Sequence, residues 1–326
     1  MSPLQFTSWF RPQVWGGRRL QAVLGKPLPP EGRFGEAWDL SSQPLHISRV
    51  AAGPLAGQTL AELWSRLAPE WRGADAVSGQ PFPLLVKWLD CHDQLSVQVH
   101  PDDAAAGRLL GDRCGKTEAW VVIHAEPDAR IYAGLQPGVD ASLLCAAIDD
   151  GTVARHLHAF QPQRGDVVFI PAGTVHAAGG GIVMAEIQQT SDATFRLYDW
   201  QRPGPDGQPR PLHLREALAC IDWSRGPVDP VARLDLDAPA DAEPQTLLEC
   251  PYFAFRAVRL RSRAQRLSGE GVSILMTLAG AAEVESAAGA VALPLGATCL
   301  LPPSPDGWSV RPIDPAGATL LQTPIV

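Results

Sequence analysis

The chain has 326 residues, of which 45% are hydrophobic, so it is long enough for two domains or one enlarged domain. Its 35 acidic residues outnumber 27 lysines and arginines, and the net charge of −8 without a basic run argues against nucleic-acid binding. No apolar stretch reaches the roughly 18 residues of a membrane helix, and the N-terminus lacks signal-peptide features, so we expect a cytoplasmic protein with no membrane partner.

Turns and short strands are predicted for residues 1–56, and the clearest strand among them is 35–42. Residues 58–68 then change to helical periodicity, which predicts an amphipathic helix that ends before Pro69. The apolar stripe of this helix consists of Leu60, Leu63, Trp64 and Leu67.

A strand predicted for residues 95–100 carries polar side chains on one face. Its polar and apolar residues alternate strictly, so that successive side chains point to opposite faces. A half-buried strand turns such a polar face either to solvent or to a functional site. The polar face holds Ser96, Gln98 and His100.

A second strand with a polar face is predicted for residues 115–123, between short helices at 104–110 and 140–148. The period of two places Lys116 and Glu118 on the same face of this strand. An ammonium group and a carboxylate are therefore expected side by side.

Residues 165–176 have the spacing Gly-x5-Pro-x-Gly-x2-His. This pattern predicts a strand at 166–170, a tight turn at 171–173 and a new strand that begins with His176. A further apolar strand follows at 182–189. An isolated turn of this kind is also compatible with a surface hairpin whose histidine has no function, so the neighbouring strands must decide.

The sequence changes character after residue 200. Residues 202–211 are rich in turn formers, residues 212–221 form a predicted helix, and residues 225–245 are rich in Pro, Asp and Ala, as expected of a surface connection. In the last 80 residues the Gly-x5-Pro spacing recurs and ends at Pro302. Gly307 then stands where the earlier segment has His176, so this part cannot repeat the same site. It is expected to cover a sheet edge or extend the core, and a lost or altered ligand-binding role is the alternative.

Two imidazoles, a carboxylate and an amide oxygen can converge if the predicted strands lie side by side. Neutral nitrogen and hard oxygen ligands suit a divalent ion. We expect one such ion per chain, zinc in the first place, with manganese, iron and cobalt as alternatives.

Several motifs resemble those of the mannose-6-phosphate isomerase family, a group of metal-dependent cupin isomerases, in its short bacterial type I form. The resemblance covers roughly residues 8–200, and the 17 residues between His100 and Glu118 are typical of the family. The matching motifs lie at residues 14–20, 35–41, 83–90, 100–103, 115–118, 171–176 and 186–196.

The resemblance implies a mainly β fold. Residues 1–224 would form a cupin jelly-roll catalytic domain with helical insertions, and residues 225–245 would connect it to a degenerate cupin-like β-domain at 246–326. The resemblance also implies the roles of individual residues. The metal ligands would be Gln98, His100, Glu118 and His176, and the residues around the sugar would be Lys116, Glu186, Asp192 and Arg196.

The spacing of Glu186, Asp192 and Arg196 supports a common cavity. Positions 186, 188, 190 and 192 share one parity, so a carboxylate and an arginine can face the same space. Arg196 would be the natural partner of a phosphate, because its planar fork offers paired charge-assisted hydrogen bonds. Ser96 and Lys116 could add phosphate or hydroxyl contacts. A mutual surface ion pair of Asp192 with Arg196 is the alternative.

The implied activity is the interconversion of mannose 6-phosphate and fructose 6-phosphate through a cis-enediol, with a small sugar phosphate as the partner and no organic cofactor. Either Glu186 or Lys116 would carry the proton between C2 and C1. The alternatives are an isomerase of a non-phosphorylated sugar, a cupin dioxygenase with iron, and a sugar-binding regulator. The oligomeric state stays open.

Overall fold

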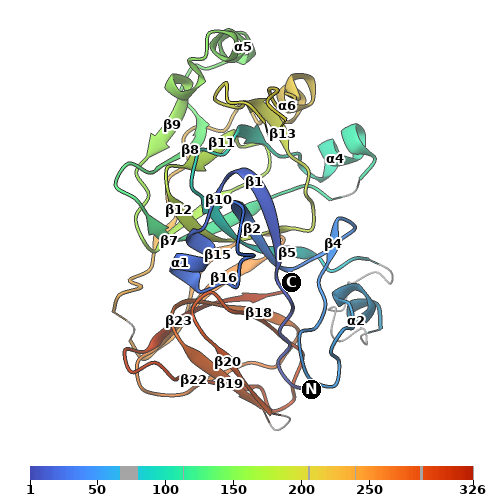
Figure 1. Ribbon diagram of the computed structural model, residues 1–326, viewed down its shortest axis with the longest axis vertical. Coiled ribbons are helices and arrows are strands. Elements are labelled where there is room, and N and C mark those ends of the chain that lie inside the picture. Colours follow the sequence, from blue (N-terminus) through green and yellow to red (C-terminus); the bar gives the residue numbers. More distant parts are fainter. Residues whose placement is uncertain (67–79, 113, 205, 239, 287–288, 326) are drawn as a thin grey trace.

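The computed structural model describes residues 1–66, 80–112, 114–204, 206–238, 240–286 and 289–325. Two parts rich in β-strands lie one above the other, with the C-terminal strands, orange to red, below the rest of the chain (Figure 1). The predicted mainly β fold with helical additions and a second β-lobe is confirmed. No helix in the described ranges is long and apolar enough to cross a membrane.

The larger sheet of the N-terminal part has seven antiparallel strands. Side chains of its central strand, β12, point alternately to the two faces of the sheet. Glu186 lies on the inner face, whereas Ala185 and Ile187 pack into a core on the outer face. The predicted strands at 166–170 and 182–189 are confirmed with these bounds. In spatial order the strands are β1 (Trp9–Gly17), β2 (Phe34–Leu40), β5 (Leu84–Cys91), β12 (Ile182–Gln189), β7 (Glu118–Ala125), β10 (Asp166–Ile170) and β14 (Ala232–Arg233).

A second sheet of five antiparallel strands faces the first. His176 begins β11 as predicted, and Gln98 of β6 stands beside it in the ladder. Arg196 of β13 is the partner of Gln98 on the other side, so three polar residues lie in one row across this sheet. Strand β6 is shorter than the predicted 95–100. The order is β13 (Phe195–Tyr198), β6 (Val97–Val99), β11 (His176–Gly179), β8 (Arg130–Leu135) and β9 (Leu157–Phe160).

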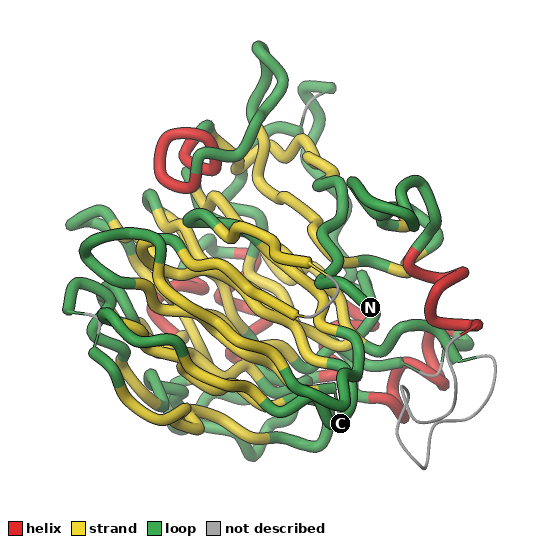
Figure 2. Tube along the Cα trace, turned by 90° about the horizontal axis from the view of Figure 1, so that it is seen from below, coloured by secondary structure: helices red, strands yellow, loops and turns green. Residues whose placement is uncertain are grey.

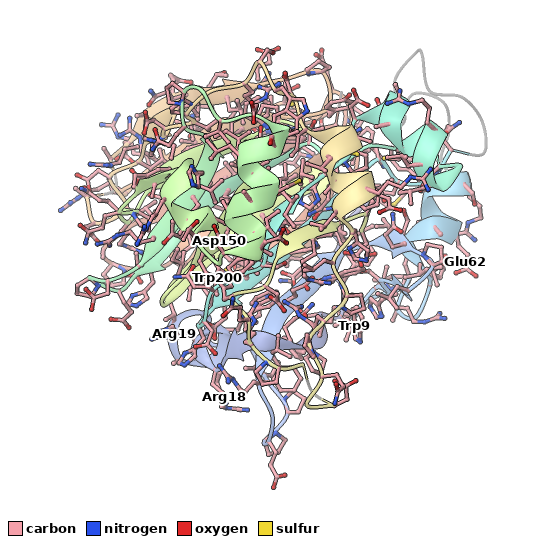
Figure 3. The ribbon with its side chains drawn as sticks, turned by 90° about the horizontal axis from the view of Figure 1, so that it is seen from above. Trp9, Arg18, Arg19, Glu62, Asp150 and Trp200 are labelled. Atoms are coloured by element: carbon pink, nitrogen blue, oxygen red, sulfur yellow. The ribbon has the colours of Figure 1, made fainter. Side chains whose placement is uncertain are left out.

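The four predicted helices are present. Wherever a helix end lies in the described residues, it is within three residues of the predicted end. Leu67 and Pro69, at the predicted end of the first helix, lie outside the described residues. Asp102 and Asp140 start two of them by accepting hydrogen bonds from Ala105 N (2.6 Å) and Leu143 N (2.8 Å). The helices labelled α4, α5 and α6 lie toward the end opposite the C-terminal strands (Figure 1). Figure 3 looks onto this end, where Asp150 follows the last residue of α5. The helix α1 was not predicted. The helices are α1 (Arg19–Leu24), α2 (Leu60–Arg66), α4 (Asp103–Leu110), α5 (Ala141–Asp149) and α6 (Leu214–Cys220), with a 3-10 turn at Val153–His156.

The C-terminal part consists of two further antiparallel sheets around their own core, and Figure 2 views them from below. Residues 225–245, expected as a connection, also supply β14 and the start of β15. The five-stranded sheet is β15 (Ala242–Glu249), β16 (Ala254–Leu260), β23 (Ala318–Pro324), β18 (Ser273–Gly280) and β21 (Thr298–Leu301). The four-stranded sheet is β17 (Gln265–Leu267), β22 (Trp308–Pro312), β19 (Ala282–Ser286) and β20 (Gly289–Leu293); the pair β3 (Ser42–Gln43) and β4 (His46–Ile47) stands apart.

A separate hydrophobic cluster spans both parts. Trp88 and Ile187 of the seven-stranded sheet belong to the same buried cluster as Phe255 and Leu321 of the C-terminal sheet. Of the two structural roles predicted for the C-terminal part, the extension of the core is the one observed.

A buried carboxylate also joins the two parts. Asp39 of β2 forms an ion pair with Lys26 (2.7 Å) and accepts hydrogen bonds from Trp88 Nε1 (3.0 Å) and Thr298 Oγ1 (2.6 Å) of the C-terminal sheet. Ser8 Oγ donates a further hydrogen bond at 2.6 Å. The buried carboxylate is thus both paired and hydrogen-bonded, which is the condition under which such a charge is stable in a protein interior.

Candidate active site

Four polar side chains meet between the facing sheets, and they come from three separate places in the chain. Glu118 begins β7, His100 follows β6, and His176 begins β11. The His and Glu ligand atoms all lie within 4.8 Å of one another. Glu118 Oε2 is 3.5 Å from His100 Nε2, and Glu118 Oε1 is 3.3 Å from His176 Nε2. The amide of Gln98 completes the group, with its Nε2 3.2 Å from His176 Nε2.

Both imidazole rings are oriented by backbone carbonyls. His100 Nδ1 lies 2.8 Å from Ala193 O, and His176 Nδ1 lies 2.9 Å from Thr174 O. A carbonyl oxygen only accepts, so Nδ1 carries the proton in each ring and Nε2 is left with its lone pair facing Glu118. This arrangement is typical of histidines that bind metals.

The charge state of the cluster also suits a cation. Burial and the neighbouring Lys116 lower the pKa of His100 to about 3, and burial lowers the pKa of His176 as well, so both rings are neutral. Burial alone would raise the pKa of Glu118, but the charges around it, that of Lys116 above all, outweigh burial and lower this pKa well below its usual range. The result is a buried carboxylate beside two neutral imidazoles.

Lys116 supplies the only ammonium group in contact with this cluster among the described residues. Its Nζ lies 2.7 Å from Glu118 Oε2 and 3.0 Å from His100 Nε2. Neither oxygen of Glu118 accepts a well-aligned hydrogen bond from a described residue, although both are inaccessible to water. A buried carboxylate with unused acceptor capacity is a favourable place for a divalent ion.

A cavity of about 260 Å³ opens next to the cluster. The five residues predicted around the sugar all line it: Ser96, Lys116, Glu186, Asp192 and Arg196. The other lining residues are Arg11, Gln13, Trp15, Glu36, Lys87, Leu89, Leu95, Gln98, Trp120, Thr194 and Arg210.

Glu186 faces the cavity as part of a buried charge network. Its Oε2 lies 3.2 Å from Lys87 Nζ, and its Oε1 accepts a hydrogen bond from Trp120 Nε1 at 3.1 Å. Burial raises the pKa of Glu186, and Lys87 opposes this shift. Burial tends to lower the pKa of Lys87 itself, but Glu186 and Glu36 reverse this effect and raise it, so the lysine stays charged.

The three arginines of the cavity differ in their partners. Arg11 pairs with Asp192 at 3.0 Å, and Arg210 binds Asp199 through two nitrogens, each at 2.6 Å. Arg196 donates to the carbonyl oxygen of Pro211 at 2.7 Å, and its Nε has no hydrogen-bond partner among the described residues. The mutual ion pair of Asp192 with Arg196, one of the alternatives raised by the sequence, is therefore absent, because Arg11 takes Asp192.

Four charged residues of the cavity were not predicted from the sequence. Arg11, Glu36, Lys87 and Arg210 all line it. One signal was available, since Lys87 interrupts the apolar run from Leu84 to Leu89, and a buried charge needs a partner. For Arg11 and Arg210 the surrounding residues carry no comparable signal.

The described residues of the C-terminal part form no equivalent site. A Cβ atom at Gly307 would lie only 2.6 Å from Leu267 O, so a histidine does not fit there without a shift of the backbone. Among the described residues, His100, Glu118 and His176 form the only cluster of three or more His, Cys, Asp or Glu side chains with metal-ligand spacing.

Comparisons with known proteins agree with this geometry. The family model of the phosphomannose isomerase type I catalytic domain matches residues 4–119. The chain is 36% identical to the mannose-6-phosphate isomerase ManA of Bacillus subtilis (strain 168) over 252 residues, 77% of this chain and 78% of the relative. It is 32% identical to the mannose-6-phosphate isomerase of Streptococcus mutans over 306 residues, 94% of each. The crystal structure of a Bacillus subtilis mannose 6-phosphate isomerase superposes with a TM-score of 0.86 at 29% identity over the full length of both chains. The chain therefore belongs to the type I mannose-6-phosphate isomerase family.

Proposed function

We propose that this enzyme interconverts mannose 6-phosphate and fructose 6-phosphate through a cis-enediol, with one divalent ion held by Gln98, His100, Glu118 and His176. The observation that carries the proposal is the buried His100, Glu118 and His176 cluster beside a cavity lined by acidic and basic groups. Residues 1–224 would form the catalytic domain and residues 246–326 a supporting one, with 225–245 between them.

The donor set fits zinc best among the common divalent ions. Two neutral imidazoles and one carboxylate are ligands that zinc accepts in catalytic sites. The amide of Gln98 would turn its oxygen toward the ion, a rotation that exchanges two atoms of similar size. When bound, the ion polarises substrate oxygens on which negative charge develops.

The residues of the chain would move the proton between C2 and C1. Glu186 is the favoured carrier, because its raised pKa and its position on the cavity wall suit a group that takes up and releases a proton. Lys87 would stabilise the carboxylate form after release, since it lies 3.2 Å away. Lys116 is the alternative carrier. Its Nζ is already in contact with Glu118 at 2.7 Å and with His100 at 3.0 Å.

Arg196 would bind the phosphate. Arg11 and Arg210 already neutralise carboxylates, whereas Arg196 pairs with none among the described residues and retains an unused donor. A phosphate offers the paired acceptors that a guanidinium fork matches. This difference favours a phosphorylated sugar over a free one.

The test is an assay of the purified, zinc-supplemented protein on mannose 6-phosphate and on mannose, with ketose formation as the readout. We expect turnover of the phosphorylated sugar and much weaker turnover of mannose. Equal rates on both would favour a free-sugar isomerase. Oxygen consumption that depends on iron, without ketose, would favour a dioxygenase, and sugar binding without turnover would favour a regulator.

A further inference from the structure

The insertion between His100 and Glu118 closes back onto its own first turn. Asp103, at the start of α4, accepts hydrogen bonds from Gly115 N at 2.7 Å and from Gln189 Nε2 at 2.9 Å, both through Oδ1. Its other oxygen accepts a hydrogen bond from the hydroxyl of Tyr252 at 3.0 Å. Tyr252 lies between β15 and β16, so the C-terminal part contacts the insertion at this point.

Gln189, the last residue of β12, holds the residue between Lys116 and Glu118. Its Oε1 accepts a hydrogen bond from Thr117 N at 2.8 Å, and its own backbone N donates to Thr117 O at 3.1 Å. The side chain of Gln189 is buried, and its amide is used at both ends: the oxygen on Thr117 and the nitrogen on Asp103. A rotation of Thr117 would turn both of its neighbours away from the site.

The same segment is bonded to the two loops that carry the histidines. Lys116 N donates to Pro101 O at 2.9 Å, and Ala172 N, in the loop before His176, donates to Thr117 Oγ1 at 3.3 Å. The segment also approaches α4 very closely, because a Cβ atom at Gly115 would lie 2.6 Å from the carbonyl carbon of Asp102. The backbone of residues 115–118 can therefore shift only if these contacts break.

We propose that Asp103 and Gln189 are positioning residues, which hold the backbone of residues 115–118 in place. Glu118 would thereby reach the ion and Lys116 the sugar. Tyr252 of the C-terminal part would in turn hold Asp103 in place. The inference rests on the proposed function, since it takes Glu118 to be a metal ligand. It gives the C-terminal part a role in the site although that part has no ligand of its own.

The geometry separates positioning from general stability. Asp103 is largely exposed, so its loss opens no cavity in the core. Asparagine at this position keeps an oxygen for Gly115 and Gln189 and offers its amide to the Tyr252 hydroxyl. Asp103→Asn is therefore the matched control for Asp103→Ala.

The experiment uses the full chain with Co²⁺ as the probe, because the absorption of bound cobalt reports its coordination directly. Cobalt affinity is measured by competition with a chelator, alongside kcat, KM and the thermal midpoint. We expect Asp103→Ala and Gln189→Met to weaken cobalt binding by about 10- to 100-fold and to alter its spectrum, as is common when the partner of a metal ligand is removed. Asp103→Asn should stay within about threefold of the parent, and Tyr252→Phe should lose about two- to tenfold, the effect of one hydrogen bond.

Two results would overturn the inference. The first is a parent-like cobalt affinity and spectrum in both Asp103→Ala and Gln189→Met, even if their thermal midpoints fall, because the contacts would then serve stability alone. The second is an Asp103→Asn variant as impaired as Asp103→Ala. Failure of the proposed function looks different: the parent would bind no cobalt, or His176→Ala would bind it as tightly as the parent.

Discussion

Replacement of Arg196 by alanine tests the phosphate assignment. Among the described residues, the guanidinium of Arg196 makes one hydrogen bond, to Pro211 O. The bond from the backbone N–H of Arg196 to His213 survives the substitution. We therefore expect little change in stability. The main loss should fall on the bound phosphate, whose charge would no longer be matched in a partly desolvated cavity.

The expected magnitude follows from the burial of the site. Loss of one partner from a buried, hydrogen-bonded charge pair costs about 2–5 kcal/mol, and the half-buried position of Arg196 places the loss toward about 2–4 kcal/mol. This corresponds to a decrease of about 30- to 700-fold in kcat/KM for mannose 6-phosphate. The value for free mannose should change by less than about threefold, because no phosphate contact is lost.

The assay compares kcat/KM on both sugars for the parent, Arg196→Ala and Arg196→Lys. Lysine keeps the charge but lacks the planar fork, so an intermediate loss is expected on the phosphorylated sugar alone. Equal losses on both sugars would refute the reasoning and show that Arg196 supports the reaction centre or the fold instead.

Three further predictions concern the ion, the proton carrier and the joint between the two parts. His176→Ala should lose most bound zinc and most activity while keeping its circular dichroism spectrum, since the ring begins a strand whose backbone pairing remains; stoichiometric zinc by elemental analysis would contradict its role as a ligand. Glu186→Gln should abolish exchange of the C2 hydrogen of the sugar with solvent, measured by NMR in deuterated buffer, because the amide cannot accept the proton. Loss of this exchange in Lys116→Met but not in Glu186→Gln would reassign the carrier to the lysine. Asp39→Ala should lower the free energy of unfolding in urea by about 3–5 kcal/mol, because it leaves the buried ammonium of Lys26 unpaired; a loss below about 1 kcal/mol, the value of a surface pair, would argue against this account.

The sequence predicted the strands and turns that carry the proposed ligands because these segments alternate clearly or end in distinct turn residues. The turn before His176 and the alternation around Gln98 are examples. The strand β2 was also predicted, at 35–42, but it is buried at every position, so no periodic signal marked Glu36 as a cavity residue. The short helix α1 was also missed, since six residues show too little of a helical period. The neighbours of Arg196 depend on contacts between distant segments, which no local pattern reveals.

The pairing of β12 has a consequence for how faithfully the molecule folds. Glu186 stands opposite Lys87 on one neighbouring strand and opposite Trp120 on the other. A slip of one residue would turn Glu186 into the shared apolar core and bring Ile187 into the cavity. A misaligned β12 would thus bury a carboxylate without its lysine, a severe energetic penalty. The charged residues of the cavity therefore also destabilise an incorrect alignment of β12. We expect enzymatic activity to return during refolding at the same time as the native sheet forms.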